Sequence, residues 1–422
     1  MGTRIYLIGC GSGEAAMLSG QARGVLESAD LVIGAGRLLD SLGLCLQGRQ
    51  ERLYKTDEIA EKLRRFRTQE GSAGQDRTAA VLLSGDTGFF SGAIPLARVL
   101  DEEGIPFTIL PGISSMAMLA AKLHTSYSDW NIVSLHGTVQ TVDEIRSKVT
   151  EGIMTGRRTC YLTGGHVLPQ TVLLTYVEAG LGNLQAAVGE ALFTDSEKVT
   201  RGKASELAGE HFSGMAVLLM EASPAFPARA GGLPDALFTR GHVPMTKQYT
   251  RAAILAAMGA VDGSTIWDIG AGTGSVSVEL ALSCRKSRVF AIEKDPEGVR
   301  LICENREKFH CYNLFVCQGK APRALEGLPK PDFVFIGGSS GNLKEIIDTV
   351  YAASLSARVT LTSVTIETAA QAADLFGRLG RHYEVVQISQ ARSEIISHYH
   401  MMRAENPVII VTAEGEGKAE VS

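Results

Sequence analysis

Three glycines follow a short apolar segment in the second half of the chain, at a spacing that can hold a nucleotide-like cofactor. The segment Thr265–Ile269 leads into Gly270, Gly272 and Gly274, and Glu293 ends the next apolar run, about 20 residues further on. Glycines in a strand-to-helix turn let backbone amides approach a ligand closely, and an acid at this distance can bind ribose hydroxyls. These residues predict a cofactor site built on a strand–loop–helix–strand unit.

The spacing of the loop bears on which cofactor it holds. A dinucleotide loop reads Gly-x-Gly-x-x-Gly/Ala, but Ser275 occupies the third position here, and Ala271 and Thr273 separate the glycines as Gly-x-Gly-x-Gly. S-adenosylmethionine has no pyrophosphate, so its ribose and ammonium must be fixed by acids, and Asp268 at the strand end can help hold the methionine part. The loop therefore favours S-adenosylmethionine over a nicotinamide dinucleotide, with a loop that binds no ligand as the remaining alternative.

The chain opens with a second loop of the same spacing. Residues 5–9 form an apolar run that ends in Gly9, and Gly11 and Gly13 follow at alternate positions. Taken alone, this loop is a weak signal of a cofactor site. The sequences around the two loops differ, which indicates a fusion of two domains rather than a duplication.

Strand-like and helix-like segments, which would position both loops, alternate along the chain. Short apolar runs ending at Gly, Ser or Pro are separated by helix-like segments in both halves, which is typical of α/β folds. A stretch with Pro224, Pro227 and a glycine pair interrupts the alternation. We therefore expect an α/β domain at 1–222, a linker at 223–231, a second α/β domain at 232–415 and a disordered tail at 416–422.

Composition limits the possible functions. The 422 residues carry a formal net charge of −5, so no basic field is available for nucleic acid, and an anionic ligand would need a local basic pocket. Seven scattered cysteines without a Cys-x-x-Cys pair predict neither a disulfide framework nor a metal site. No apolar run approaches the roughly 20 residues of a membrane span. We expect a soluble cytoplasmic enzyme.

The second half resembles the decarboxylating precorrin methyltransferases. The resemblance spans about residues 232 to 411 and implies a class I, Rossmann-like methyltransferase fold. By position it places Thr246, the loop 270–274, Glu293, Gly319 and Ala321 around the cofactor, whereas Lys320 stands where the family usually has Asp. The resemblance is carried by Gly232-Leu-Pro-Asp-Ala-Leu-Phe, Val243-Pro-Met-Thr-Lys, Trp267-Asp-Ile-Gly-Ala-Gly-Thr-Gly-Ser, Ala291-Ile-Glu-Lys-Asp, Gly319-Lys-Ala-Pro and Phe335-Ile-Gly-Gly-Ser.

The first half, about residues 4 to 222, resembles the tetrapyrrole methylases, and most closely the branch that methylates C-5 of the precorrin ring. This implies a class III fold with a cofactor cleft between two α/β subdomains, in which the opening loop faces both substrate and cofactor. Gly85, Asp86, Ser114 and Ser115 would contact the cofactor, and Thr87 replaces a proline found in many members. The resemblance is carried by Tyr6-Leu-Ile-Gly-Cys-Gly-Ser-Gly, Leu83-Ser-Gly-Asp-Thr-Gly-Phe-Phe, Leu110-Pro-Gly-Ile-Ser-Ser, Ser134-Leu-His-Gly and Val188-Gly-Glu-Ala-Leu.

Together the resemblances imply one S-adenosylmethionine per domain and methylation of precorrin-6B, or its cobalt complex, at C-5 and C-15. The ring-C (C-12) acetate would lose carbon dioxide, giving precorrin-8 in cobalamin biosynthesis. Meso carbons of a reduced tetrapyrrole are enamine-like nucleophiles, so positioning and exclusion of water suffice and no strong base is needed. Methylation at C-15 creates a conjugated iminium beside ring C, which can accept the electrons released by decarboxylation in the same domain.

Other side chains are weaker candidates. Lys247 follows Thr246, and it either binds a substrate carboxylate or is a surface lysine. Glu367 either orients the substrate or is an acid at the start of a helix, where the helix dipole favours a negative charge. Arg392 and Arg403, with two histidines between them, form either a basic lip for acetates and propionates or a solvated loop. His136 is expected to contact substrate or to hold a loop. A homo-oligomer is also expected.

Two other classes of function stay open. A class I domain can also methylate RNA or protein, because fold does not fix function. A non-catalytic tetrapyrrole carrier or sensor is the second alternative. The missing basic stripe disfavours RNA, and two glycine loops with partner acids disfavour a carrier.

Overall fold

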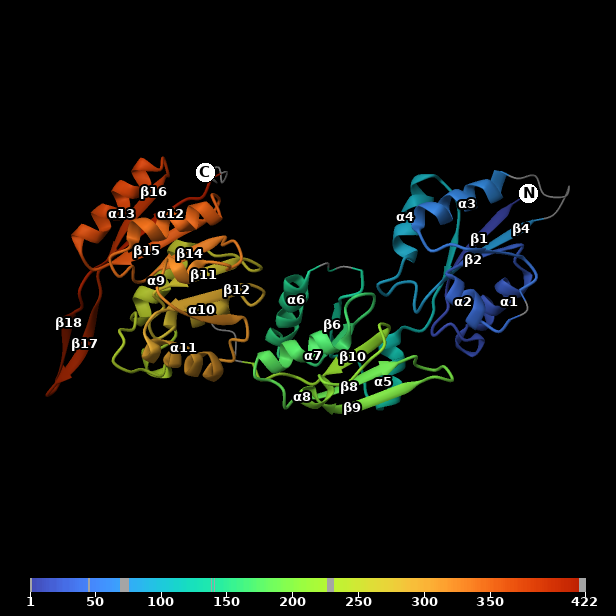
Figure 1. The fold of residues 1–422 in the computed structure, drawn as a ribbon, viewed down its shortest axis with the longest axis horizontal. Coiled ribbons are helices and arrows are strands. Elements are labelled where there is room, and N and C mark those ends of the chain that lie inside the picture. The colour runs from blue at the N-terminus through green and yellow to red at the C-terminus, as the bar shows by residue number, and fades with distance from the viewer. Residues whose placement is uncertain are drawn as a thin grey trace. The chain divides into compact units, whose positions relative to one another are not determined.

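The computed structural model describes residues 2–44, 46–68, 76–137, 139, 141–225 and 231–416. The chain divides into two compact units (Figure 1). The N-terminal unit comprises residues 1–145 and 157–222, and the C-terminal unit comprises residues 146–156 and 223–422. Most of the expected linker (226–230) and of the expected tail (417–422) lies outside the described residues. Residues 146–156 are thus separated in sequence from the rest of the C-terminal unit.

The first sheet of the N-terminal unit is parallel throughout. Its strands run in the order β3-β2-β4-β1-β5. Strands β1 and β4 are therefore neighbours inside the sheet, and the loops with Gly11 and Gly85 follow their carboxyl ends. Buried apolar side chains pack against both faces, as parallel sheets require. The elements are β1 (Thr3–Gly9), η1 (Ala15–Met17), α1 (Gly20–Ser28), β2 (Leu31–Gly34), α2 (Gly36–Ser41), β3 (Arg49–Arg52), α3 (Thr56–Thr68), β4 (Arg77–Leu83), α4 (Ala93–Glu102) and β5 (Thr108–Leu110).

A second sheet of the N-terminal unit is mixed. Its order is β6-β7-β10-β8-β9, and only the β6–β7 pair is parallel. Helix α5 contributes buried Met116 and Leu119 to the core of this sheet. The elements are α5 (Ser115–Leu123), β6 (Asn131–Ser134), β7 (Thr159–Leu162), α7 (Pro169–Glu178), β8 (Gln185–Glu190), β9 (Lys198–Lys203), α8 (Ala204–Leu207) and β10 (Ala216–Met220). Helix α6 (Val142–Met154) lies between β6 and β7 in the chain, and its residues from 146 onward belong to the C-terminal unit.

The C-terminal unit contains a seven-stranded sheet in the order β13-β12-β11-β14-β15-β19-β16, with β19 antiparallel to both neighbours. Helices α12 and α13 pack on one face, and α9, α10 and α11 on the other. The elements are η2 (Asp235–Leu237), α9 (Gln248–Met258), β11 (Thr265–Ile269), α10 (Ser275–Ser283), β12 (Arg288–Glu293), α11 (Pro296–Lys308), β13 (Leu314–Gln318), η3 (Arg323–Leu325), β14 (Phe333–Ile336), α12 (Leu343–Ala353), β15 (Arg358–Ser363), α13 (Ile366–Arg378), β16 (Tyr383–Ile388) and β19 (Val408–Ala413).

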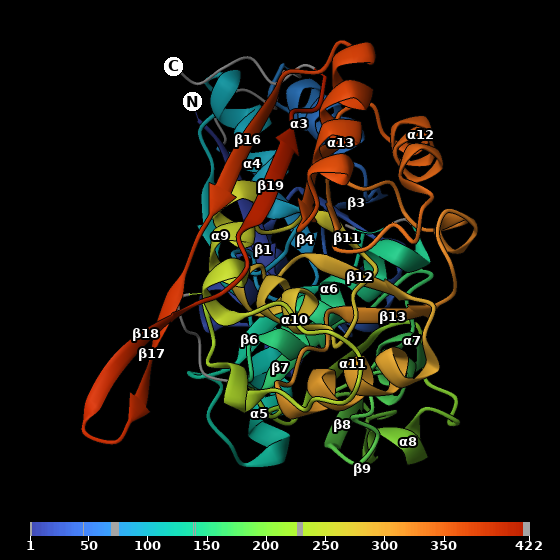
Figure 2. The ribbon, with the colours of Figure 1, turned by 90° about the vertical axis from the view of Figure 1, so that its left-hand side faces the viewer.

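A two-stranded hairpin lies between β16 and β19 in the sequence, although these two strands are paired in the sheet. Among the described strands, β17 (Ala391–Ile396) and β18 (Tyr399–Ala404) pair only with each other, and both views show them extending away from the rest of the unit (Figures 1 and 2). Nearly all of their side chains are exposed.

The α/β class predicted from the alternating pattern is confirmed in both units. No described helix has the length and apolar character needed to cross a membrane. The described residues also contain no group of three His, Cys, Asp or Glu side chains placed to hold a metal ion.

Candidate active sites

A cavity of about 1120 Å³ lies at the carboxyl ends of the parallel strands of the C-terminal unit. Parallel strands end at the same edge of a sheet, and such edges are where open α/β sheets bind ligands. The cavity brings together most of the residues predicted for this half. Among its lining residues are Thr246, Lys247, Gly270, Ala271, Gly272, Glu293, Gly319 and Ala321.

The glycine loop passes between two other backbone segments. Gly270 and Gly272 hold φ values of +73° and +58°, a region that other residues rarely adopt. A Cβ on Gly270 would lie 2.6 Å from the Gly338 carbonyl oxygen, and one on Gly272 would lie 2.9 Å from the Pro244 carbonyl oxygen. Glycine at these positions therefore lets the loop approach the segments after β14 and before α9.

Two predicted loop residues face inward instead. Thr273 is 1% exposed, and its carbonyl accepts a bond from the Asn305 side chain at 3.0 Å. Gly274 begins α10, and a Cβ there would lie 2.9 Å from Ile302 on α11. Neither residue is among those that line the cavity; they fix the loop against α11.

Glu293 is buried at the end of β12, and its carboxylate holds the loop. One oxygen accepts a bond from the Gly272 amide at 2.8 Å, and the other accepts from the amides of Lys294 at 2.8 Å and Asp295 at 2.9 Å. A carboxylate offers about four lone-pair sites. One site is left for a ribose hydroxyl, which fits the predicted role.

Substituting Gly298 with alanine is expected to weaken cofactor binding in the C-terminal unit about tenfold. A Cβ there would lie 2.7 Å from Cγ of Glu293 and 3.0 Å from the Gly272 carbonyl oxygen, so the carboxylate must move off the loop. Titration with S-adenosylhomocysteine measures the loss. The matched control is Gly377→Ala in α13, where nothing lies within 4 Å of the added atom. Equal affinities of both variants would contradict the expected role of Glu293.

Asp268 is fully buried two residues before Gly270 and is not among the residues that line the cavity. One oxygen accepts a bond from the Ser277 hydroxyl, and the other has no hydrogen-bond partner among the described residues. Burial raises the pKa of Asp268 to about 7, an effect that the Ser277 hydroxyl opposes and the Glu293 charge reinforces. An ammonium group bound near it would compensate the carboxylate, which fits a site for the methionine part of the cofactor.

The raised pKa of Asp268 predicts a pH-dependent cost to stability. Between its ordinary pKa of 3.8 and about 7, the folded state holds a proton that the unfolded state has lost, so the free energy of unfolding falls as pH rises through this window. Asp268→Asn removes the effect. We expect the variant to be more stable than the parent by about 2–4 kcal/mol near pH 8, with no difference near pH 4. Urea unfolding at several pH values tests this, and a constant difference would contradict it.

The N-terminal site is built where three glycine loops meet at the carboxyl ends of β1, β4 and β5. Gly11 and Gly85 exchange two backbone bonds of 2.9 and 3.1 Å. A Cβ on Gly112 would lie 2.2 Å from the Gly85 carbonyl oxygen, and one on Gly9 would lie 2.6 Å from the Gly112 nitrogen. Glycine therefore permits a close approach of the three loops, and the structure brings together the predicted Gly9, Gly11 and Gly85.

Asp86 ties two of these loops together. Its carboxylate accepts bonds from the Gly88 amide at 2.9 Å and from the Gly112 amide at 3.0 Å. Ser114 caps α5, where its hydroxyl accepts a bond from the Ala117 amide at 3.2 Å, and Ser115 begins that helix. These side chains thus have structural partners in addition to their predicted cofactor contacts.

Two other predicted residues of this unit lie elsewhere. Gly13 packs near α2, where an added Cβ would lie 2.8 Å from the Ser41 hydroxyl. His136 is exposed after β6, and its ring lies against Gly164, since a Cβ there would meet Nδ1 at 2.1 Å. Thr87, which replaces a proline found in many tetrapyrrole methylases, is 3% exposed in the loop after β4.

The predicted basic lip does not line the cavity. The Arg392 guanidinium lies 3.5 Å from both Asp235 and Glu405, and Arg403 pairs with Glu394 at 2.9 Å on the hairpin. Glu367 is exposed in the first turn of α13. Of these weaker candidates, only Lys247 is among the lining residues.

Comparisons with known proteins agree with this division. Residues 4–208 match the Tetrapyrrole (Corrin/Porphyrin) Methylases, and residues 236–414 match the Precorrin methyltransferase domain. The precorrin-6Y C(5,15)-methyltransferase [decarboxylating] of Sinorhizobium sp. is 30% identical over 92% of this chain and 91% of its own length. The chain belongs to the decarboxylating precorrin C(5,15)-methyltransferases. Methyltransferases of this kind use S-adenosylmethionine in general.

Shorter relatives match part of the chain. A probable cobalt-precorrin-6B C(15)-methyltransferase (decarboxylating) of Pyrobaculum calidifontis is 40% identical over 44% of this chain and 98% of its own length. The crystal structure of a precorrin-6y C5,15-methyltransferase from Geobacter metallireducens GS-15 shares 35% identity and covers 45% of this chain and 100% of that chain, with a TM-score of 0.43.

The cavity of this precorrin methyltransferase also includes residues that the sequence did not single out. Lys294 and Asp295 directly follow Glu293, so the strand-end acid could have pointed to them. Ser340 comes shortly after the Gly337-Gly338 pair that follows β14, so this pair could have pointed to it. Thr365 and Thr368, after β15, and Gln390 and Glu405, between β16 and β19, have no glycine loop to mark them.

Proposed function

We propose that the chain methylates precorrin-6B, metal-free or carrying cobalt, at C-5 and C-15 and removes carbon dioxide from the ring-C acetate, giving precorrin-8. The observation that supports this most is the presence of a glycine-lined cavity in the C-terminal unit and of three meeting glycine loops in the N-terminal unit of a single chain. The relative that aligns over both units is named for methylation at two carbons. One cofactor would bind in each unit, within a cytoplasmic enzyme.

The residues of each site serve binding and orientation. When bound, S-adenosylmethionine supplies an electrophilic methyl group. Glu293 offers a lone pair to its ribose, and the second oxygen of Asp268 suits its ammonium. The meso carbon of the substrate is itself the nucleophile, so the loops need only hold it in line and exclude water. Lys247 on the cavity wall would bind a substrate carboxylate, while Glu367, His136, Arg392 and Arg403 remain predictions.

Decarboxylation is assigned to the C-terminal unit. The Pyrobaculum relative is named for both C-15 methylation and decarboxylation, although nearly all of its length matches under half of this chain. The name of that relative thus pairs the two activities in a protein whose matched length is under half of this chain. The same pairing follows from chemistry, because methylation at C-15 generates the electron acceptor that the departing carboxyl group needs.

Calorimetric titration with S-adenosylhomocysteine tests the paired sites. We expect two molecules to bind per chain, and Glu293→Ala to weaken one of them by about 1.5–3 kcal/mol, at least tenfold in Kd. The other site should keep its affinity. Binding of a single molecule by the parent chain would overturn the proposal of one cofactor per unit.

We also propose that the chain forms a homo-oligomer through the β17–β18 hairpin. Ile395, Tyr399 and Met402 are 69%, 77% and 63% exposed on strands that pair only with each other. Exposed apolar strands are prone to pair with another chain. Tyr399→Lys should lower the mass measured by sedimentation equilibrium, and a parent chain of monomer mass would refute the proposal.

A further inference from the structure

The charged side chains that line the C-terminal cavity differ in how they are partnered. Its acids are Glu293, Asp295, Glu297 and Glu405, and each already has a hydrogen-bond or ion-pair partner. Three of them accept bonds from backbone amides, and Glu405 lies beside Arg392. The acids are thus engaged in shaping the cavity wall.

The cavity also contains three lysines, Lys247, Lys294 and Lys320. All three are exposed, and within the described part of the chain none of them forms an ion pair. Lys294 donates one bond, at 2.7 Å, to the Ser340 hydroxyl. Each ammonium has three donors, so most of the hydrogen-bonding capacity of these groups is available to a ligand.

The bond to Ser340 fixes where the Lys294 ammonium lies. Lys294 follows β12, Ser340 follows β14, and β11 lies between these two strands. The ammonium therefore reaches across the carboxyl end of β11, where the glycine loop starts. Ser340 holds φ at +51°, which is uncommon for a residue other than glycine. Lys320 follows β13, on the other side of β12, between the cavity-lining Gly319 and Ala321.

The cofactor and the substrate differ in charge, so they are expected to use different charged side chains of the cavity. The ribose and ammonium of S-adenosylmethionine suit the acids Glu293 and Asp268, and its single carboxylate can pair with only one of the three ammonium groups. A cavity of about 1120 Å³ is also larger than the 300–1,000 Å³ of ordinary ligand sites. The space and the unpaired cations together suit a second, anionic ligand.

We infer that Lys294 and Lys320, together with Lys247, bind carboxylates of a polycarboxylate tetrapyrrole in this cavity. This inference rests on the proposed function and adds the groups that recognise its substrate. Lys294 holds one carboxylate above the loop that binds the cofactor, with the Ser340 hydroxyl completing the pair of donors. Lys320 binds another carboxylate at the β13 side of the cavity.

Equilibrium dialysis of precorrin-6B against the full chain, with saturating S-adenosylhomocysteine, measures binding apart from turnover. The variants are Lys294→Gln, Lys320→Gln and their combination, and the matched control is Lys330→Gln, an exposed lysine outside the cavity. We expect each cavity variant to raise the Kd of one precorrin site about tenfold. Added salt should weaken binding more in the parent than in the double variant. Lys294→Arg should restore much of the affinity, and Lys330→Gln should change nothing.

S-adenosylhomocysteine binding separates this role from a cofactor role. Its Kd should stay within about twofold in every variant, which also shows that the variants fold. Loss of S-adenosylhomocysteine affinity, or unchanged precorrin affinity in both single variants, would overturn the inference. Lysine-dependent binding of precorrin without any methylated product would support the inference and overturn the proposed function. A parent chain that does not bind precorrin would overturn both.

Discussion

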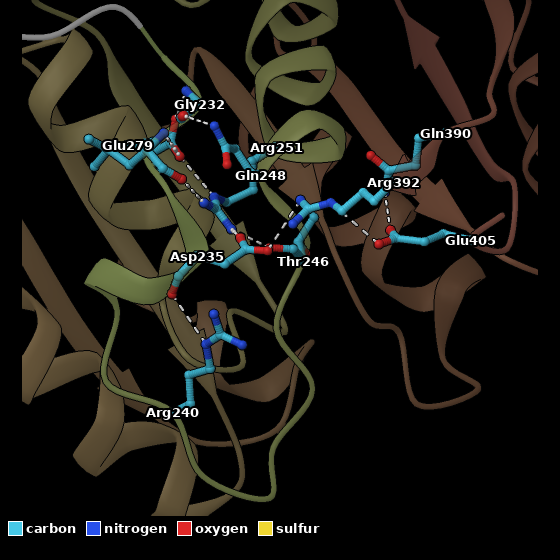
Figure 3. Close-up of polar contacts among 11 residues, drawn as sticks. Gly232, Asp235, Arg240, Thr246, Gln248, Arg251, Glu279, Gln390, Arg392 and Glu405 are labelled. Atoms are coloured by element: carbon cyan, nitrogen blue, oxygen red, sulfur yellow. Dashed lines mark hydrogen bonds and ion pairs between the residues drawn. The ribbon is translucent and has the colours of Figure 1, made fainter. Parts of the chain in front are cut away.

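Arg251→Met is expected to destabilise the C-terminal unit by about 3–5 kcal/mol, because it leaves two buried carboxylates without their partner. Arg251 on α9 is 0% exposed. Its Nε donates to Glu279 at 2.8 Å, and Nη1 donates to Asp235 at 2.8 Å (Figure 3). The guanidinium also lies over the ring of Phe238, with its carbon 4.6 Å from the ring centroid. Removing one member of a buried charge group costs far more than an exposed pair contributes.

The same guanidinium ties the segment before α9 to the body of the unit. It donates to the carbonyl oxygens of Leu233 and Thr246, while Glu279 accepts from the Gly232 and Leu233 amides (Figure 3). Thr246 is predicted to contact the cofactor and lines the cavity. We therefore expect Arg251→Met also to weaken S-adenosylhomocysteine binding in this unit.

Urea unfolding followed by the fluorescence of buried Trp267 measures the loss of stability in a Trp130→Phe background, which removes the tryptophan of the other unit. Following one unit matters because a two-unit chain does not unfold in a single two-state step. Arg378→Met is the matched control: its pair with Asp374, at 2.9 Å, is exposed on α13 and should contribute less than about 1 kcal/mol. Equal losses in the two variants would contradict the importance of the buried network.

Strands buried on both faces were predictable from sequence. The predicted segment 265–269 coincides with β11, and the apolar run that ends at Glu293 is β12, because a central parallel strand needs a continuous apolar run. Some strands with polar or exposed faces were missed. The edge strand β3 has the sequence Arg-Gln-Glu-Arg, and β17 and β18 were read as a basic lip or a solvated loop. Their pairing depends on neighbours that no local pattern shows.

The candidate sites were predictable to the same extent. Glycine loops and strand-end acids have fixed spacing, so Gly270, Gly272 and Glu293 were found and do share one cavity. The ion pair of Arg251 and Glu279 joins α9 to α10, and the two residues are 28 positions apart in the sequence. Nothing in this spacing predicts that the two side chains meet. Likewise, the bond from Gly112 to Asp86 depends on β5 lying beside β1, which is a property of the sheet order.

Asp86→Ala in the full chain should cause a decarboxylated, singly methylated product to accumulate from precorrin-6B, with C-5 methylation reduced at least tenfold. The carboxylate of Asp86 accepts bonds from the Gly88 and Gly112 amides. Its loss leaves these two amides without their acceptor and separates loops that must meet to form the N-terminal site. The C-terminal cavity is built from other residues, so C-15 methylation and release of carbon dioxide should continue.

The reciprocal variant makes this division of labour testable in the same assay. Glu293→Ala should reduce C-15 methylation and carbon dioxide release together, because the electrons freed from the ring-C acetate need the acceptor that C-15 methylation creates in the same bound substrate. Mass spectrometry identifies the products, and a manometric or isotopic assay follows the carbon dioxide. If Asp86→Ala stopped carbon dioxide release while C-15 methylation continued, decarboxylation would depend on the N-terminal unit. Release of carbon dioxide by Glu293→Ala without C-15 methylation would instead show that the methyl transfer does not supply the electron acceptor.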